Sequence, residues 1–208
     1  MNALAWYLQL RGSVRQAARW AGRALAIPGD VSPELRARAG SWEIGISILL
    51  GVESKPVSHV RSAIESFDGA DDPLGLAMAQ WFLGYVLLHV GHLDVSEELA
   101  EQSSTGFRSL GHDWEIAVSA SLIAHQAILR DNGKTAATAA EEAFAGFRAL
   151  EDRGGELLTI YPRAVLAEHN KDIATAERLH REGLELAGRL GSARWPANRR
   201  GQRARYLR

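Results

Sequence analysis

Apolar and polar positions repeat along this chain at intervals of about forty residues. The clearest copy covers residues 73–110, where two stretches with helical apolar spacing flank a turn at Gly91, and Gly51 stands forty residues earlier. The pattern GFRxL at 106–110 recurs at 146–150. Because a fixed period of this length is typical of stacked helical hairpins, the pattern predicts an all-α chain built from antiparallel helix pairs.

Helix boundaries follow from residues that start and stop helices. Ser32, Pro33 and Glu34 supply a capping hydroxyl, a proline at the first helical position and an acid in the first turn, and Asp72-Pro73 repeats that start. The expected helices cover residues 2–10, 14–26, 33–50, 56–67, 73–90, 94–110, 113–130, 134–150, 156–169 and 173–190. We therefore expect a single helical-repeat domain over residues 1–208, with hairpins at about 2–27, 33–67, 73–110, 113–150 and 156–190 and a basic tail or partial repeat at 191–208.

Small residues recur at three places in the repeat, where they let neighbouring helices approach closely. They are Gly84, Ala124 and Ala164 in the first helices, and Ser96, Ala136, Ala176, Ser103, Ala143 and Gly183 in the second helices. With Gly91 at the turn and Trp81-x-Leu83 before Gly84, this set resembles the tetratricopeptide repeat. The chain departs from that family in its longer period and in lacking the family's late proline. The resemblance implies an α-solenoid that forms a right-handed superhelix.

The Arg- and Ala-rich composition and the Leu-Gly junctions at 110–111 and 190–191 resemble a particular setting. They are similar to the repeat regions of large bacterial transcription regulators of the SARP type and the ATPase-containing LuxR type. This resemblance implies a non-catalytic module for protein–protein interaction or effector sensing within such a regulator. A stand-alone adaptor or scaffold of the same repeat is an alternative. HEAT-like repeats share the period, but their proline and Asp/Arg placement is not found here.

Charge is unevenly distributed. Seven of the 24 basic residues are arginines within 189–208, which holds no acid, so residues 1–188 carry 17 basic and 25 acidic side chains. An arginine-rich tail suits contact with nucleic acid, which is a further alternative function. Because the acidic body would repel phosphate, we do not expect the domain itself to bind nucleic acid.

Compartment and membrane association follow from two absences in the sequence. The chain has no cysteine, and its N-terminus shows no basic leader with a cleavage site, which favours the cytoplasm. Residues 73–90 carry no charge, but Gln80, Gly84 and His89 interrupt the stretch, and it stands in register with charged copies. We therefore expect no membrane span.

Residue patterns that carry catalysis are not found. Gly133-Lys134-Thr135 resembles the end of a phosphate-binding loop, but Ile128 stands where that loop needs glycine, and an expected helix precedes it. His89 and His92 lie three residues apart, without the i+4 partner that a helical zinc site prefers. We therefore expect no enzyme activity, no cofactor and no metal.

The functional surface that the resemblance implies is a concave groove lined by the first helices. The family's groove positions, carried onto this chain, include an aromatic and imidazole strip of Trp81, Tyr85, His89, His125, Tyr161 and His169. Such side chains suit recognition of a protein or peptide partner, or of a small effector. The alternative is that Trp81 and Tyr85 pack between hairpins. The uncharged N-terminal ten residues lead us to expect a homodimer through the N-terminal hairpin.

Overall fold

The computed structural model describes residues 14–26, 28–29 and 31–190, and their regular structure is entirely helical. The helices are α2 (Val14–Leu25), α3 (Pro33–Leu49), α4 (Pro56–Glu65), α5 (Pro73–His89), α6 (Leu93–Leu110), α7 (Asp113–Leu129), α8 (Gly133–Ala149), α9 (Arg153–His169) and α10 (Ile173–Leu190). The prediction of an all-α fold is confirmed for these residues. The helix expected at 2–10, the N-terminal dimer contact and the basic tail after residue 190 lie outside the described residues.

Most helix ends fall within two residues of the predicted ones, and the start of α9 is the main correction. The helix begins at Arg153 instead of residue 156. Asp152 caps it, because its side chain accepts a hydrogen bond of 2.9 Å from the backbone N–H of Gly154. The glycines at 154 and 155 therefore belong to the first helical turn. A side chain at residue 155 would strike the core, because a Cβ there would lie 2.0 Å from Cδ1 of Phe147.

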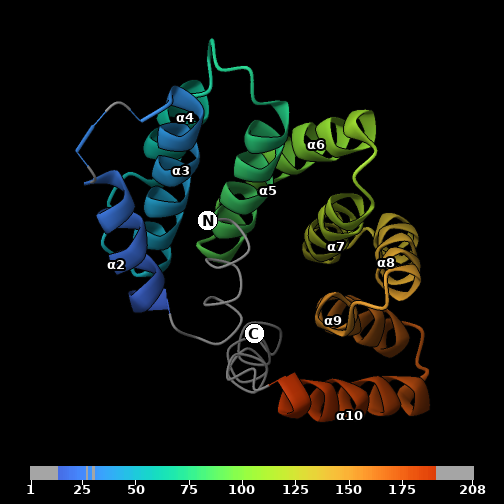
Figure 1. Ribbon diagram of the computed structural model, residues 1–208. Helices are drawn as coiled ribbons and strands as arrows, with labels where there is room; N and C mark the ends of the chain where they lie inside the picture. The colour runs from blue at the N-terminus through green and yellow to red at the C-terminus, as the bar shows by residue number, and fades with distance from the viewer. Residues whose placement is uncertain (1–13, 27, 30, 191–208) are drawn as a thin grey trace.

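Consecutive helices pack against one another and follow an arc in chain order (Figure 1). We call α3, α5, α7 and α9 the inner helices and α4, α6, α8 and α10 the outer helices. Each inner helix packs directly on the next inner helix, whereas the outer helices have few or no close backbone approaches to one another. Figure 1 accordingly shows α5, α7 and α9 on the inner side of the arc.

The turns explain the repeat period. A left-handed backbone conformation follows the helices every twenty residues, with φ of 89° at Gly91, 68° at Gly111, 56° at Asp131, 53° at Glu151 and 60° at Lys171. Each ends a helix with the same pair of backbone hydrogen bonds, as where the N–H groups of Lys171 and Asp172 donate to the carbonyls of Glu168 and Ala167 over 3.0 and 2.9 Å. The period of forty residues is thus two helix-and-turn units of twenty.

The small residues of the repeat lie where the helices touch. The members at Gly84, Ser96, Ser103, Ala124, Ala136, Ala143, Ala164, Ala176 and Gly183 are all buried. A Cβ on Gly84 would stand 3.3 Å from the backbone oxygen of Ser96. The hydroxyl of Ser96 donates to the carbonyl of Gly84 over 2.7 Å and accepts from Nε2 of Gln126 over 2.8 Å, which joins α5, α6 and α7. The expectation of close helix approach is confirmed.

Aromatic side chains connect the hydrophobic cores of successive pairs. Trp42 stacks on Phe82 with ring centroids 3.8 Å apart. Trp114 makes edge-to-face contacts with Trp81 and with Phe147, and the ring centroids are 6.3 Å apart in each pair. Since these contacts run from α3 to α8, neighbouring pairs share one core and hold each other in position.

Candidate functional site

Trp81 does not lie on an open surface. Only 1% of this residue is exposed, and its ring packs 6.3 Å from that of Trp114. A side chain with so little exposed area cannot contact a ligand without displacing its neighbours. Its assignment to the groove is therefore corrected, and the alternative reading, in which Trp81 packs between hairpins, describes its position.

Tyr85 and His89 form the first inner-surface pair. They lie one turn apart on α5, both half-buried, with ring centroids 4.2 Å apart. Nδ1 of His89 lies 2.8 Å from the carbonyl oxygen of Tyr85. Because a carbonyl only accepts, Nδ1 donates this bond, and the Nε2 of a neutral imidazole is then an acceptor. The pair offers an aromatic ring beside a ring with a polar nitrogen.

His125 and Tyr161 form the second pair, and it bridges two inner helices. The rings stack between α7 and α9, with centroids 5.4 Å apart and planes inclined by 21°. Nδ1 of His125 donates to the carbonyl of Ser121 over 2.7 Å. Burial lowers the pKa of His125 below its usual value, although the bond to Ser121 opposes that shift. The imidazole is thus neutral near pH 7.

His169 stands apart from both pairs. It is the last residue of α9, its side chain is 63% exposed, and Nδ1 lies 3.9 Å from a carboxylate oxygen of Asp131. The predicted strip of six residues is therefore divided in the structure. It consists of one core tryptophan, two half-buried pairs and an exposed histidine at a helix end.

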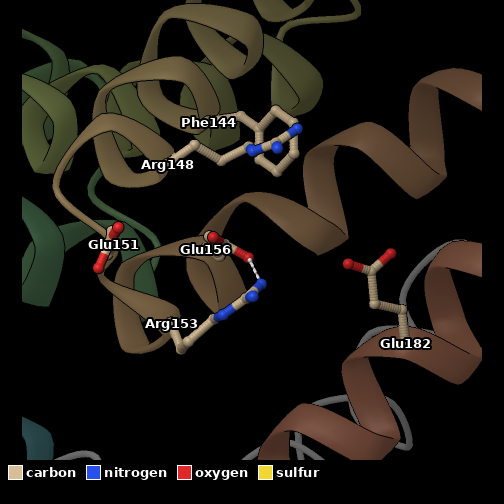
Figure 2. A pocket seen from close by; sticks show the side chains of 6 residues that line it. All are labelled: Phe144, Arg148, Glu151, Arg153, Glu156 and Glu182. Atoms are coloured by element: carbon tan, nitrogen blue, oxygen red, sulfur yellow. Dashed lines mark hydrogen bonds and ion pairs between the residues drawn. The ribbon is translucent and has the colours of Figure 1, made fainter.

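Sequence reasoning missed a polar cleft at the C-terminal end of the described helices (Figure 2). The cleft has a volume of about 640 Å³. Its lining comes from α8, the turn after it, the start of α9, and α10, and consists of Phe144, Arg148, Glu151, Arg153, Glu156 and Glu182. Arg153 Nη1 donates to a carboxylate oxygen of Glu156 over 2.9 Å, and Glu156 is only 6% exposed. One feature of the sequence could have indicated this cleft, because the acidic Glu156 stands where the preceding copy of the repeat has the apolar Ile116.

Residues 14–26, 28–29 and 31–190 contain neither a cluster of metal-ligating side chains nor a helix that could span a membrane. There, no three side chains of His, Asp or Glu come close enough together to hold a metal ion. None of the helices described combines the length and apolar character that crossing a membrane requires. Gly133-Lys134-Thr135 opens α8 after a turn from α7, so a helix and not a strand precedes it.

The fold defines a class, that of all-helical proteins with a helical-repeat arrangement. No protein-family model and no curated protein matches the sequence. Among solved structures, the chain is similar to the crystal structure of BtubC (BKLC) from P. vanneervenii, with a TM-score of 0.64 over 88% of this chain and 74% of that chain. At 17% sequence identity, this similarity concerns the fold alone.

Proposed function

We propose that this protein is a non-catalytic binding module, an α-solenoid of tetratricopeptide-like hairpins that forms a right-handed superhelix. The observation that carries the proposal is the layer of inner helices, which pack on one another and present half-buried rings from α5, α7 and α9. Because the inner helices pack more closely than the outer ones, the array curves with the inner helices on its concave side.

The ligand that best fits this surface is an extended or helical peptide of a protein partner. Tyr85 and His89 give one contact point, and the stacked His125 and Tyr161 give a second on the neighbouring helices. Aromatic rings with a polar edge supply apolar area and a directed hydrogen bond, at a low cost in conformational entropy. A small effector held by one pair is the other ligand that this chemistry accommodates.

Two finer parts of the proposal depend on the sequence resemblance alone. By that resemblance, the module belongs to a bacterial transcription regulator in the cytoplasm, and ligand binding stabilises one curvature of the array. A ligand can do so only through different affinities for the two curvatures. A stand-alone adaptor would use the same groove without that coupling.

The test is a selection of peptides from a random library displayed on phage, with the immobilised protein as bait. We expect enriched peptides to bind the wild type and to lose at least tenfold in affinity for Tyr85→Ala and for Tyr161→Ala. Thr138→Ala, at an exposed position on the outer helix α8, is the matched control and should bind as the wild type. Enriched peptides that bind all variants equally would place recognition elsewhere, and a library without enriched peptides would contradict peptide binding.

The small-effector arm needs a separate measurement. Native mass spectrometry of the protein, gently purified from its own host, should show a stoichiometric mass excess that the Tyr161→Ala variant lacks. A bare mass together with an unsuccessful peptide selection would contradict the groove as a binding surface.

A further inference from the structure

The polar cleft between α8 and α10 replaces apolar packing with charge at equivalent places of the repeat. Glu156 and Arg163 stand where Ile116 and Ile123 stand forty residues earlier. Glu156 is buried with Arg153 as its partner, and the side chain of Arg163 is only 18% exposed. In the preceding hairpin, Ile116 and Ile123 on α7 pack against the hydrophobic core, so the fold does not require charged residues at these places. Burying charges is costly, so these residues point to a role beyond stability.

Arg163 contacts one of the residues that line the cleft, Phe144. Its guanidinium carbon lies 3.7 Å from the ring centroid of Phe144, and its closest carboxylate contact is a 3.6 Å approach to the exposed Glu141. Burial lowers its pKa below the usual value for arginine. Phe144, which takes the place of Ser104, is thereby backed by a cation and stands as the apolar wall of the cleft.

An ion pair between outer helices forms in one copy of the repeat, but its equivalent does not form in the next copy. Arg108 on α6 is hydrogen-bonded to Glu142 on α8, which bridges two outer helices. Forty residues on, Arg148 on α8 and Glu182 on α10 occupy those places, but they form no ion pair with each other in the described structure. Instead they lie on different walls of the cleft, as Figure 2 shows.

The charges left over in the cleft define its ligand. Arg153 and Glu156 neutralise one another. Arg148 has only the Phe144 ring as a partner among the described residues, at 5.6 Å. Glu182 lies 3.9 Å from Arg178 and interacts electrostatically with Arg163, but it accepts no hydrogen bond within the described residues. Glu151, in its left-handed turn, adds an exposed carboxylate to the rim. The volume of about 640 Å³ falls within the usual range for ligand pockets, about 300–1,000 Å³.

We propose that this cleft is a second binding site, which takes a zwitterionic ligand with an anionic group on Arg148 and a cationic group on Glu182. By binding both Arg148 and Glu182, the ligand links α8 to α10. The direct ion pair of Arg108 and Glu142 links α6 to α8 in the same way. The ligand is either a free amino-acid-like molecule or a segment of peptide with one acidic and one basic side chain. The residues that line the cleft are different from the four half-buried rings of the groove between the inner helices.

The experiment uses isothermal titration calorimetry with defined probes. The mixed-charge probes are 6-aminohexanoate and a capped peptide with one glutamate and one lysine separated by two alanines. The single-charge probes are the same peptide with alanine in place of either charged residue. We expect at least one mixed-charge probe to bind saturably, and the single-charge peptides to bind at least about tenfold more weakly, because each loses a charge-assisted hydrogen bond.

Variants then locate the binding. Arg148→Ala and Glu182→Ala should each weaken the mixed-charge probe by about tenfold or more, and the charge-swapped double variant Arg148→Glu/Glu182→Arg should recover binding to the flexible 6-aminohexanoate. Arg108→Ala and Glu142→Ala, at the places of the closed ion pair, are matched controls and should leave binding unchanged. Thermal melting of each variant checks that it folds.

Three outcomes would overturn the site. They are no saturable binding of either mixed-charge probe, binding that survives both Arg148→Ala and Glu182→Ala, and an equal loss in the Arg108→Ala control. Binding of 6-aminohexanoate assigns the cleft to a small molecule, whereas binding of the peptide alone assigns it to a segment of a protein partner. Since neither Tyr85 nor Tyr161 lines the cleft, failure of the groove and failure of the cleft are distinguishable.

Discussion

Asp72 joins two inner helices through a single carboxylate, and its replacement tests how the hairpins are held together. It caps α5 by accepting a hydrogen bond of 2.9 Å from the backbone N–H of Gly75. It also accepts two bonds from Arg38 on α3, each 2.5 Å long, in a bidentate pair. Asp72 is 8% exposed, whereas the side chain of Arg38 is 31% exposed. Replacing Asp72 therefore removes both the cap of α5 and the ion pair between α3 and α5.

The expected magnitude follows from these two functions. Loss of a helix cap costs about 0.5–2 kcal/mol. Loss of the ion pair adds about 1–2 kcal/mol, below the value for a fully buried pair because water still reaches Arg38. Asp72→Ala should therefore lower the free energy of unfolding by about 1.5–4 kcal/mol. Asp72→Asn, which keeps a capping oxygen, should lower it by about 1–2 kcal/mol.

Urea denaturation followed by circular dichroism measures these differences. The hydrogen bonds from Arg38 lower the pKa of Asp72 below its usual value, so its stabilising contribution is complete above about pH 4 and is lost as the pH falls through the lowered pKa. Asp72→Asn should flatten that acid-side loss. Asp71→Asn, at an exposed neighbour, is the control. If Asp72→Asn costs no more than Asp71→Asn, the ion pair contributes nothing and the reasoning is refuted.

Two other properties are open to measurement. Lys171→Gly and Glu151→Gly should each raise the free energy of unfolding by about 0.5–1 kcal/mol, because glycine adopts the left-handed backbone of those turns without strain. Gly91→Ala should lower the free energy of unfolding by about 1 kcal/mol for the opposite reason. A lower free energy of unfolding in both glycine variants would contradict the turn geometry. Burial lowers the pKa of His125, so the unfolded chain binds the proton more readily and stability should fall as the pH drops below about 6.5. Titration of the His125 imidazole by NMR checks this, and a pKa at or above the usual value would be incompatible with it, while His125→Gln should remove its share of the pH dependence.

The sequence by itself determined the helical architecture of the described residues. Helix length, turn position and the buried small residues all repeat locally, so each copy supports the reading of the others. Even the left-handed turns at Asp131 and Lys171, which have no glycine at that position, could be placed from Gly91 by the period. Such features depend on residues near one another in the chain, where periodicity and capping rules are informative.

Only the tertiary structure decided which of these side chains are available to a ligand. Trp81 and Tyr85 occupy adjacent turns of α5, yet the first is buried against Trp114 and the second remains half-buried beside His89. Likewise, Arg108 and Arg148 share one place in the repeat, but only Arg108 meets its glutamate on the next outer helix. Burial and pairing depend on neighbouring hairpins, whose bulk at residues such as Phe144 differs from copy to copy, and a single helix cannot specify them.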